Sequence, residues 1–335
     1  MFSAQENLEK IFRFIKTLHG LLFIVASVSI CIFSVYFITS IDKPNNIHEP
    51  LTLIIKPGSS SLKIATILAN NRVINNKWIF LLYVKTVAQS RKLVAGEYEF
   101  LPGQSLKSVV KIICDGESIV RKIKIPEGYT SSQIIDLLLK EERLVGTIQS
   151  DTIQEGSLFP DTYYFKYGDL RSKIIKLMRE RMRSTLDRLV PQLANNSFID
   201  NEEKLINLAS IVEKEAGNDV EKPIIASVFL NRIKKNMPLQ ADPTVIYGIT
   251  MGKSSFGRVL TKKDLLFDSP YNTYIYRGLP PGPIACPGLK SLQSVINPAK
   301  TNYIYFVADG KGGHNYSINL EDHNIFVKIL RKAQN

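Results

Sequence analysis

The hydrophobic and polar positions along the chain begin with one long apolar run. Residues 18–39 contain no Lys, Arg, Asp or Glu. A helix rises 1.5 Å per residue, so these residues would cross a hydrocarbon core of about 30 Å. A signal peptide is one competing interpretation, but its apolar region is usually about 7–15 residues long. A buried globular helix is another. We predict a retained transmembrane helix over 18–39, preceded by a tail at 1–17 and followed by a polar linker at 40–50.

The basic residues near this run predict its orientation. Lys10, Arg13 and Lys16 precede it, whereas only Lys43 follows closely. By the positive-inside rule, the N-terminus is expected in the cytoplasm and most of the chain outside it. That location disfavours ATP, NAD and chromosomal DNA as partners.

After the linker, a pattern of β-rich run, turn and capped apolar-periodic segment occurs three times. It predicts strands at 51–55, 98–101 and 119–125, each followed by a helix, at 62–68, 105–113 and 130–139. Another helix is expected at 78–88. The first two units, residues 51–115, resemble the LysM-like module of certain bacterial envelope proteins. A basic helix around 170–189, expected to be solvated, and a loop near 191–199 come next.

Residues 203–216 predict an amphipathic helix. Its apolar stripe is formed by Leu205, Leu208, Ala209, Val212 and Ala216. Glu215 lies on one shoulder of that stripe and Glu213 on the opposite shoulder, so the two cannot act together on one bond. A carboxyl at the edge of an apolar stripe is desolvated, which raises its pKa and keeps it protonated as an acid. Ordinary boundary glutamates are the simpler interpretation, and Gly217 is expected to end the helix.

The last third of the chain is rich in irregular segments, at 240–244, 271–274, 278–288 and 309–314. Loops held by a scaffold are where binding residues concentrate. The aromatic candidates for stacking on sugar rings are Tyr271, Tyr274 and Tyr276. The candidates for hydrogen bonds to hydroxyl groups are Gln240, Asp242, Asn272 and Thr273. The same residue types also suit a plain β-rich surface.

Composition limits the chemistry. Lys and Arg number 43 against 31 Asp and Glu, a net charge of +12, which favours an acidic partner or simply a solvated basic surface. Three cysteines exclude a dense disulfide scaffold, and pairing of Cys114 with Cys286 stays open. His314 and His323 lack the spacing of a zinc site, so no metal is expected. Cys286 has nothing nearby in the sequence to lower its pKa, which disfavours a thiol catalyst.

Eight stretches in a fixed order carry a resemblance to a known family. They are GSLFPDTY (156–163), LASIVEKE (208–215), ASVFLNR (226–232), LQADPTVIYG (239–248), YNTY (271–274), GLPPGPIACPG (278–288), NPAK (297–300) and YFVADGKGGH (305–314). In this combination the chain resembles the endolytic murein transglycosylase family, also called the YceG-like family, over about residues 51–330. Ala241 and Cys286 depart from the residues common in the family, which concerns substrate contact rather than activity.

The resemblance implies a membrane-anchored enzyme that cleaves the β-1,4 bond between N-acetylmuramic acid and N-acetylglucosamine within glycan strands. The product would be a 1,6-anhydro end, with Glu215 donating a proton to the leaving oxygen and then accepting one from the muramyl 6-hydroxyl. Residues implied to line the cleft are Gln240, Asp242, Tyr271, Asn272, Thr273, Tyr274 and His314, with Glu213 as a further binding candidate.

The implied partners are peptidoglycan glycan strands, the bilayer through residues 18–39, and glycan-polymerising synthases, without nucleic acid or cofactor. The implied location is the bacterial inner membrane, with the catalytic domain in the periplasm. We expect an α+β fold, with the small module at 51–115 and a larger mixed α/β catalytic domain at 116–335.

Two alternatives remain open. A lysozyme-like hydrolase would need a second carboxylate, for which Asp161 and Asp242 are candidates. A non-catalytic envelope scaffold would bind glycan through residues 51–115. The chemical nature of the products distinguishes these alternatives.

Overall fold

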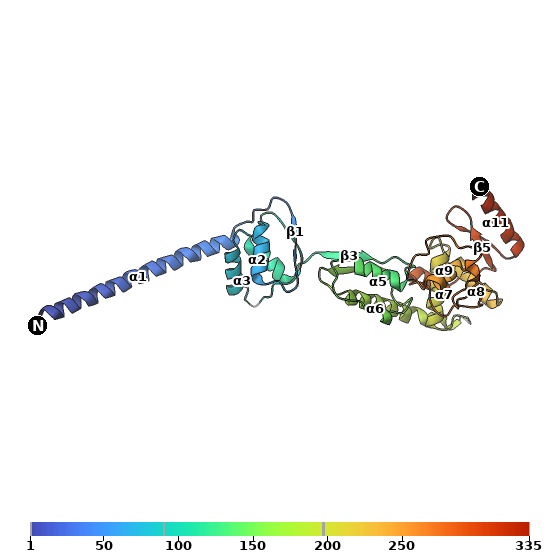
Figure 1. Cartoon of the computed structure of the whole chain (residues 1–335), viewed down its shortest axis with the longest axis horizontal. Coiled ribbons are helices and arrows are strands. Elements are labelled where there is room, and N and C mark those ends of the chain that lie inside the picture. Colours follow the sequence, from blue (N-terminus) through green and yellow to red (C-terminus); the bar gives the residue numbers. More distant parts are fainter. Residues whose placement is uncertain (1, 90, 196–197, 335) are drawn as a thin grey trace. The chain divides into compact units, whose positions relative to one another are not determined.

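The computed structural model describes residues 2–89, 91–195 and 198–334, and Figure 1 follows its elements along the chain. These residues form two compact units. The first runs up to Val120 and includes Lys166–Gly168, and the second contains Arg121–Phe165 and the chain from Asp169 onward.

The chain begins with one long helix, α1 (Phe2–Asp42). Its segment Lys16–Asp42 has a mean hydropathy of 2.6 and is long and apolar enough to cross a membrane. Apolar side chains along it, such as Phe23 and Ile30, are exposed, which suits contact with lipid. The predicted apolar helix is therefore confirmed, and it extends beyond residues 18–39. Its orientation stays a prediction.

The rest of the first unit is a two-stranded sheet packed with three helices. Strand β1 (Leu51–Ile55) pairs antiparallel with β2 (Gly96–Phe100). Helices α2 (Ser61–Asn70) and α3 (Lys77–Thr86) lie between these strands in the sequence, and α4 (Leu106–Asp115) follows them. The side chains of Ser60 and Ser105 cap α2 and α4 by accepting backbone N–H bonds. The predicted strands and capped helices of this region are confirmed.

The second unit begins with a strand pair and two helices that share a small core. Strand β3 (Val120–Lys124) pairs with β4 (Thr162–Lys166). Helix α5 (Ser131–Lys140), a short 3-10 turn η1 (Ser150–Thr152) and helix α6 (Arg171–Leu189) complete this part. The loop expected near 191–199 is instead partly ordered as the 3-10 helix η2 (Val190–Asn195).

The larger core of this unit surrounds α7 (Glu202–Glu215). This helix contacts α8 (Lys222–Lys234), α9 (Asp242–Thr250) and α10 (Leu289–Ile296). The turn η3 (Asp264–Leu266) precedes α10, and the hairpin β5 (Tyr305–Ala308) and β6 (His314–Ser317) leads to the last helix, α11 (Leu320–Gln334). Figure 1 shows α7, α8 and α9 gathered in this part of the chain.

Two local predictions were wrong. The segment 240–244 was expected as a loop, but α9 already begins at Asp242 because Pro243 fits the first turn of a helix. Gly217 does not end α7 through a left-handed conformation, since the helix stops at Glu215 and Ala216 is extended. A Cβ at Gly217 would lie 2.9 Å from the carbonyl oxygen of Gly312, so glycine is needed there for close approach of the β5–β6 turn.

Candidate active site

Glu215 is the last residue of α7, and the second unit surrounds its carboxyl group. The apolar stripe of α7 is buried against α8, α9 and α10, which brings the end of the helix to the start of α9. There the backbone N–H of Asp242 acts on the Glu215 carboxyl group in the direction that lowers its pKa. Burial, and to a smaller extent the charge of Asp242, raise the pKa of Glu215 to about 8. The group therefore carries its proton at neutral pH.

Asp242 is the second carboxyl of this site. The hydroxyl of Tyr274 donates a hydrogen bond of 2.6 Å to Asp242 Oδ1. Burial and the bond to Asp242 raise the pKa of Tyr274, so its hydroxyl stays a proton donor. The structure thus brings together three residues named from the sequence, Glu215, Asp242 and Tyr274.

Arg232 supplies the positive charge of the site, and sequence reasoning did not single it out. Its side chain is buried, and it donates hydrogen bonds to the carbonyl oxygens of Ile304 at 2.6 Å and Leu239 at 2.7 Å. The guanidinium lies 5.4 Å from the ring centroid of Tyr305. Its charge acts on Glu215 in the direction that lowers the pKa, against the larger effect of burial. The only sequence signal was its place in the ASVFLNR stretch at 226–232.

Gln240 holds a constrained backbone beside this cluster. Its φ is +51°, in the left-handed region that few residues other than glycine adopt. Its N–H donates to the carbonyl oxygen of Thr273 at 3.1 Å, and its Oε1 accepts a bond from Arg232 at 3.4 Å. Backbone strain of this kind persists where the surroundings fix it, and such positions cluster at functional sites.

Asn272 and Thr273 support the site from inside the protein. Both side chains are buried. Asn272 donates to the carbonyl oxygens of Leu265 and Phe267, and the Thr273 hydroxyl accepts the N–H of Ala241 at 3.0 Å. The resemblance implied that these side chains line the cleft, which stays a prediction, and in the structure their polar atoms are bonded to the chain.

Glu213 lies in a separate buried cluster. Its side chain is 7% exposed and pairs with Lys222 at 3.1 Å. Its other oxygen accepts hydrogen bonds from the backbone N–H of Gly288 at 2.9 Å and the hydroxyl of Ser291 at 2.6 Å. Both oxygens are therefore bonded within the protein, and the structure does not bring Glu213 together with Glu215 and Asp242.

His314 is held by a buried carboxylate that the sequence did not indicate. Glu221 Oε2 lies 3.1 Å from His314 Nδ1, and its Oε1 accepts the backbone N–H of His314 at 2.7 Å. The hydroxyl of Tyr316 donates to the same Oε1 at 3.1 Å. These bonds fix the imidazole at the start of β6, next to the turn that packs against Gly217.

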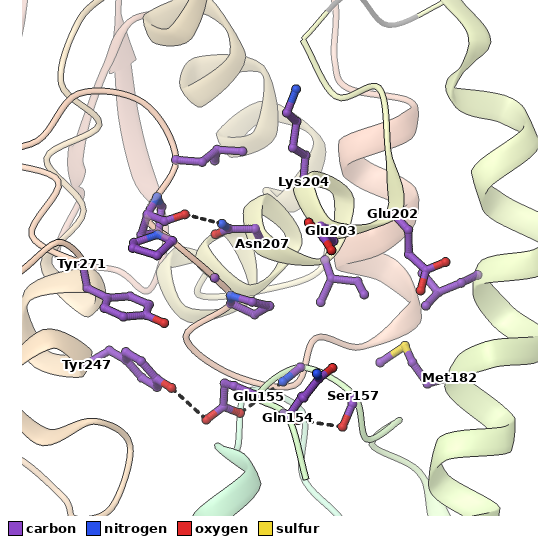
Figure 2. Close-up of a pocket in the computed structure, with 18 of the residues that line it drawn as sticks. Gln154, Glu155, Ser157, Met182, Glu202, Glu203, Lys204, Asn207, Tyr247 and Tyr271 are labelled. Atoms are coloured by element: carbon purple, nitrogen blue, oxygen red, sulfur yellow. Dashed lines mark hydrogen bonds between the residues drawn. The ribbon is translucent and has the colours of Figure 1, made fainter. Parts of the chain in front are cut away.

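Tyr271 lies at a different place, on a cavity of about 1280 Å³. Figure 2 shows it beside Tyr247, with Glu155 and Asn207 also on the wall. Glu215, Asp242 and Tyr274 do not line this cavity.

The remaining candidates lie outside this cluster. Asp161 is paired with Arg181 at 3.3 Å, and the hydroxyl of Tyr276 bonds to Asp268. Cys286 is fully buried, and burial raises the pKa of its thiol to about 12, which disfavours thiolate chemistry. All three cysteines, each within the described residues, are free thiols.

Comparison with known proteins gives concordant results. The model of the YceG-like family matches residues 53–329. The endolytic murein transglycosylase of Bacillus subtilis (strain 168) is 36% identical over 302 residues, covering 81% of this chain and 82% of that protein. That of Streptococcus pneumoniae (strain D39) is 30% identical over 324 residues, covering 83% of this chain and 58% of the relative. A crystal structure of a yceG-like protein from Listeria monocytogenes is 36% identical, with a TM-score of 0.54 over 83% of this chain and 99% of that chain.

Proposed function

Because this chain belongs to the YceG-like family and is an enzyme of the lytic transglycosylase class, we propose that it cuts peptidoglycan glycan strands internally with Glu215 as its acid. The bond cut is the β-1,4 bond between N-acetylmuramic acid and N-acetylglucosamine, and the new end is 1,6-anhydro-N-acetylmuramic acid. The observation that carries this proposal is the Glu215 carboxyl group, whose pKa burial raises to about 8.

The proposed reaction needs one carboxyl group with two successive roles. Protonated Glu215 gives its proton to the glycosidic oxygen as the bond from that oxygen to the anomeric carbon breaks. The muramyl 6-oxygen then bonds to the anomeric carbon, and its proton passes to the Glu215 carboxylate. The acid is regenerated, no water is consumed, and a second catalytic carboxylate is not required.

The other charged groups tune this acid. Asp242 favours the protonated form of Glu215 by like-charge repulsion, while its backbone N–H and Arg232 favour the carboxylate that forms after proton transfer. Because these effects oppose one another, the pKa of Glu215 stays close to neutral pH, which suits a group that must both give and take a proton. We also propose that Gln240, Tyr274 and His314 contact the sugar rings, with Tyr271 reaching the same strand farther away.

The rest of the chain supports a role at the membrane. We propose that α1 anchors the enzyme in the bacterial inner membrane with its N-terminus in the cytoplasm, because Lys10, Arg13 and Lys16 precede the apolar segment. Residues 51–115 form a β1–α2–α3–β2 arrangement followed by α4, which fits the LysM-like glycan-binding module inferred from the sequence. An enzyme at this location would trim or terminate nascent strands beside glycan-polymerising synthases.

The decisive test is mass spectrometry of purified glycan strands after incubation with the full chain in detergent micelles. We expect internal fragments with 1,6-anhydromuramyl ends from the wild type and none from Glu215→Gln. Glu213→Gln is the matched control, since it makes the same substitution two residues away on the same helix and should still yield these fragments.

Other products would contradict the proposal. Reducing ends would identify a hydrolase, with Asp242 as the carboxylate that activates water, because it is the carboxyl next to Glu215. Glycan that is bound but not cut by the wild type would identify a scaffold.

A further inference from the structure

The cavity beside Tyr271 is a candidate site distinct from the acid. It has a volume of about 1280 Å³ and is lined by α6, the N-terminal half of α7, the loop at 152–157 and the proline-rich loop at 279–283. A cavity of this size exceeds what a single sugar ring needs, since the pockets that hold drug-sized ligands measure about 300–1,000 Å³. Of the residues proposed to contact the glycan strand, Tyr271 lies on its wall, whereas Glu215, Gln240, Tyr274 and His314 do not.

One wall of the cavity is aromatic with a polar edge. The rings of Tyr247 and Tyr271 lie 4.8 Å apart between centroids. The Tyr247 hydroxyl donates to Glu155 Oε2 at 3.3 Å, and Glu155 Oε1 is held in turn by the backbone N–H of Ser131 at 2.8 Å. The Tyr271 hydroxyl has no hydrogen bond within the part of the chain that the structure describes, and Figure 2 shows it pointing toward the interior of the cavity. Rings and hydroxyls arranged in this way suit the apolar face and the hydroxyl groups of a sugar.

A buried amide among the residues that line the cavity lacks one of its partners. Asn207 is 5% exposed, and its Nδ2 donates to the carbonyl oxygen of Pro280 at 2.7 Å. Its Oδ1 is buried without a hydrogen-bond partner among the described residues. Because this oxygen is covered by the protein, Asn207 serves the cavity by holding the proline-rich loop at Pro280 rather than by contacting a ligand.

The charges around the cavity select against an ionic ligand. Arg183 and Glu202 both line it and pair with each other at 2.8 Å. Glu203 and Lys204 add one residue of each sign, and so do Glu155 and Arg179. Since the two signs balance, the lining favours a neutral polar ligand over a strongly anionic or cationic one.

The cavity and the acid are fixed relative to each other by shared elements. Asn207 and Glu215 are eight residues apart on α7, which corresponds to about 12 Å along the helix. They lie on one face with Ile211 between them, at positions i, i+4 and i+8. Helix α9 carries Asp242 at its start and Tyr247 farther along, so a second element also connects the two places.

We propose that this cavity is a second saccharide site, which holds N-acetylated sugar rings of the glycan strand away from the bond cut at Glu215. This inference rests on the proposed function, since it assumes that the same strand reaches both places. An enzyme that cuts internally needs substrate on both sides of the bond, and a distant site makes binding depend on strand length.

The first test measures binding separately from cleavage. N-acetylated chitohexaose is titrated into full-length Glu215→Gln in detergent micelles, alone and with Tyr271→Ala added, by isothermal titration calorimetry. Loss of one stacking surface should weaken binding about tenfold. Tyr164→Ala is the matched control, because Tyr164 is an exposed tyrosine of the same unit that does not line the cavity. Equal affinities with and without Tyr271→Ala would overturn the inference.

The second test uses strand length as the readout in the otherwise wild-type enzyme. Tyr271→Ala should raise KM for long glycan strands about tenfold with a much smaller change in kcat, and the increase in KM should shrink as the strands become shorter. Tyr271→Phe keeps the ring and should give an intermediate increase, which guards against simple misfolding. A loss of kcat that is equal for long and short strands would place Tyr271 at the acid and contradict the second site.

The two proposals can fail separately. If wild-type protein cuts no strand but chitohexaose binding still depends on Tyr271, the catalytic proposal fails and the saccharide site stands. If strands are cut with anhydro ends and Tyr271→Ala leaves chitohexaose binding unchanged, the saccharide site fails and the catalytic proposal stands.

Discussion

Two glutamates at the end of α7 show how different surroundings give one residue type two different roles. Glu213 and Glu215 lie two residues apart, and both are largely enclosed by the second unit. Around Glu213 the protein places the cation of Lys222 and two hydrogen-bond donors. Around Glu215 it places the carboxyl of Asp242, one backbone donor and the guanidinium of Arg232, whose effect is smaller than that of burial, and burial raises the pKa of Glu215 to about 8.

The difference follows from the elements that each side of the helix faces. Lys222 is the first residue of α8 and Ser291 belongs to α10, so Glu213 ties three helices together. Asp242 begins α9, which contributes a backbone donor and a like charge rather than a cation. A buried carboxyl with a cation stabilises the fold, whereas one beside another carboxyl keeps its proton for chemistry.

The largest effect expected from this comparison is on cleavage by Glu215→Gln. Removing the group that transfers protons should lower kcat for glycan strands by about 10²–10⁴-fold, while the fold is retained. Rates of anhydro-end formation measured by mass spectrometry would check this. Activity within a few-fold of the wild type would show that another residue is the acid.

Glu213→Gln should give the opposite result, with lost stability and retained chemistry. Breaking a buried ion pair costs about 3 kcal/mol in the free energy of unfolding, although Lys222 keeps Asp219 at 2.8 Å as a partner. Denaturant titration would measure this, with Glu203→Gln, an exposed glutamate of the same helix, as the control expected within about 0.5 kcal/mol. An unchanged unfolding free energy would show that the ion pair contributes nothing net.

The dependence of cleavage on pH should report the titration of Glu215. Cleavage requires protonated Glu215, so kcat/KM should fall as the pH rises through about 8. Asp242→Asn removes the like charge that raises this pKa, and the alkaline limb should move to lower pH. A limb that stays in place would show that the charge of Asp242 does not act on the acid.

The Glu215 carboxyl group also links the free energy of unfolding to pH. The pKa of Glu215 is about 8 in the folded protein, against about 4.3 for an unperturbed glutamate, so between these values the folded state binds more protons. Its contribution to stability is full below about pH 4.3 and is lost as the pH rises through about 8. The unfolding free energy of Glu215→Gln relative to wild type should therefore increase across this window.

The smallest effect is expected at Ser291, which donates the bond of 2.6 Å to Glu213. Ser291→Ala should lower the unfolding free energy by about 1 kcal/mol, because one hydrogen bond to a buried carboxylate is lost. The loss should largely disappear in a Glu213→Gln background, since the two changes act on one interaction. Full additivity in this double-mutant cycle would contradict the proposed coupling.

Much of the fold was predictable because local rules dominate short elements. The N-caps at Ser60 and Ser105, the apolar run in α1 and the helical stripe of α7 follow from residues within a few positions of each other. The wrong prediction at 240–244 missed a local signal, whereas the wrong prediction at Gly217 had a distant cause. The Pro243 signal for a helix start was available, whereas the need for a glycine opposite Gly312 was not.

The site was predictable only in part. The sequence identified a helix with a carboxyl on the shoulder of its apolar stripe, but helical periodicity treated Glu213 and Glu215 alike. The sequence did not indicate Arg232 or Glu221, because a buried charge is recognised by its partners. The partner of Arg232 is Ile304 and that of Glu221 is His314, about 70 to 90 residues away.

The sequence by itself determined the apolar helix, the capped strand–helix units and the family, since each depends on residue types in a fixed local order. Only the tertiary structure decided that Glu215 keeps its proton. A pKa depends on charges and solvent within a few ångströms. The charged groups that act on Glu215 are Asp242 and Arg232, and the packing of α8 and α9 against α7 brings both of them to it.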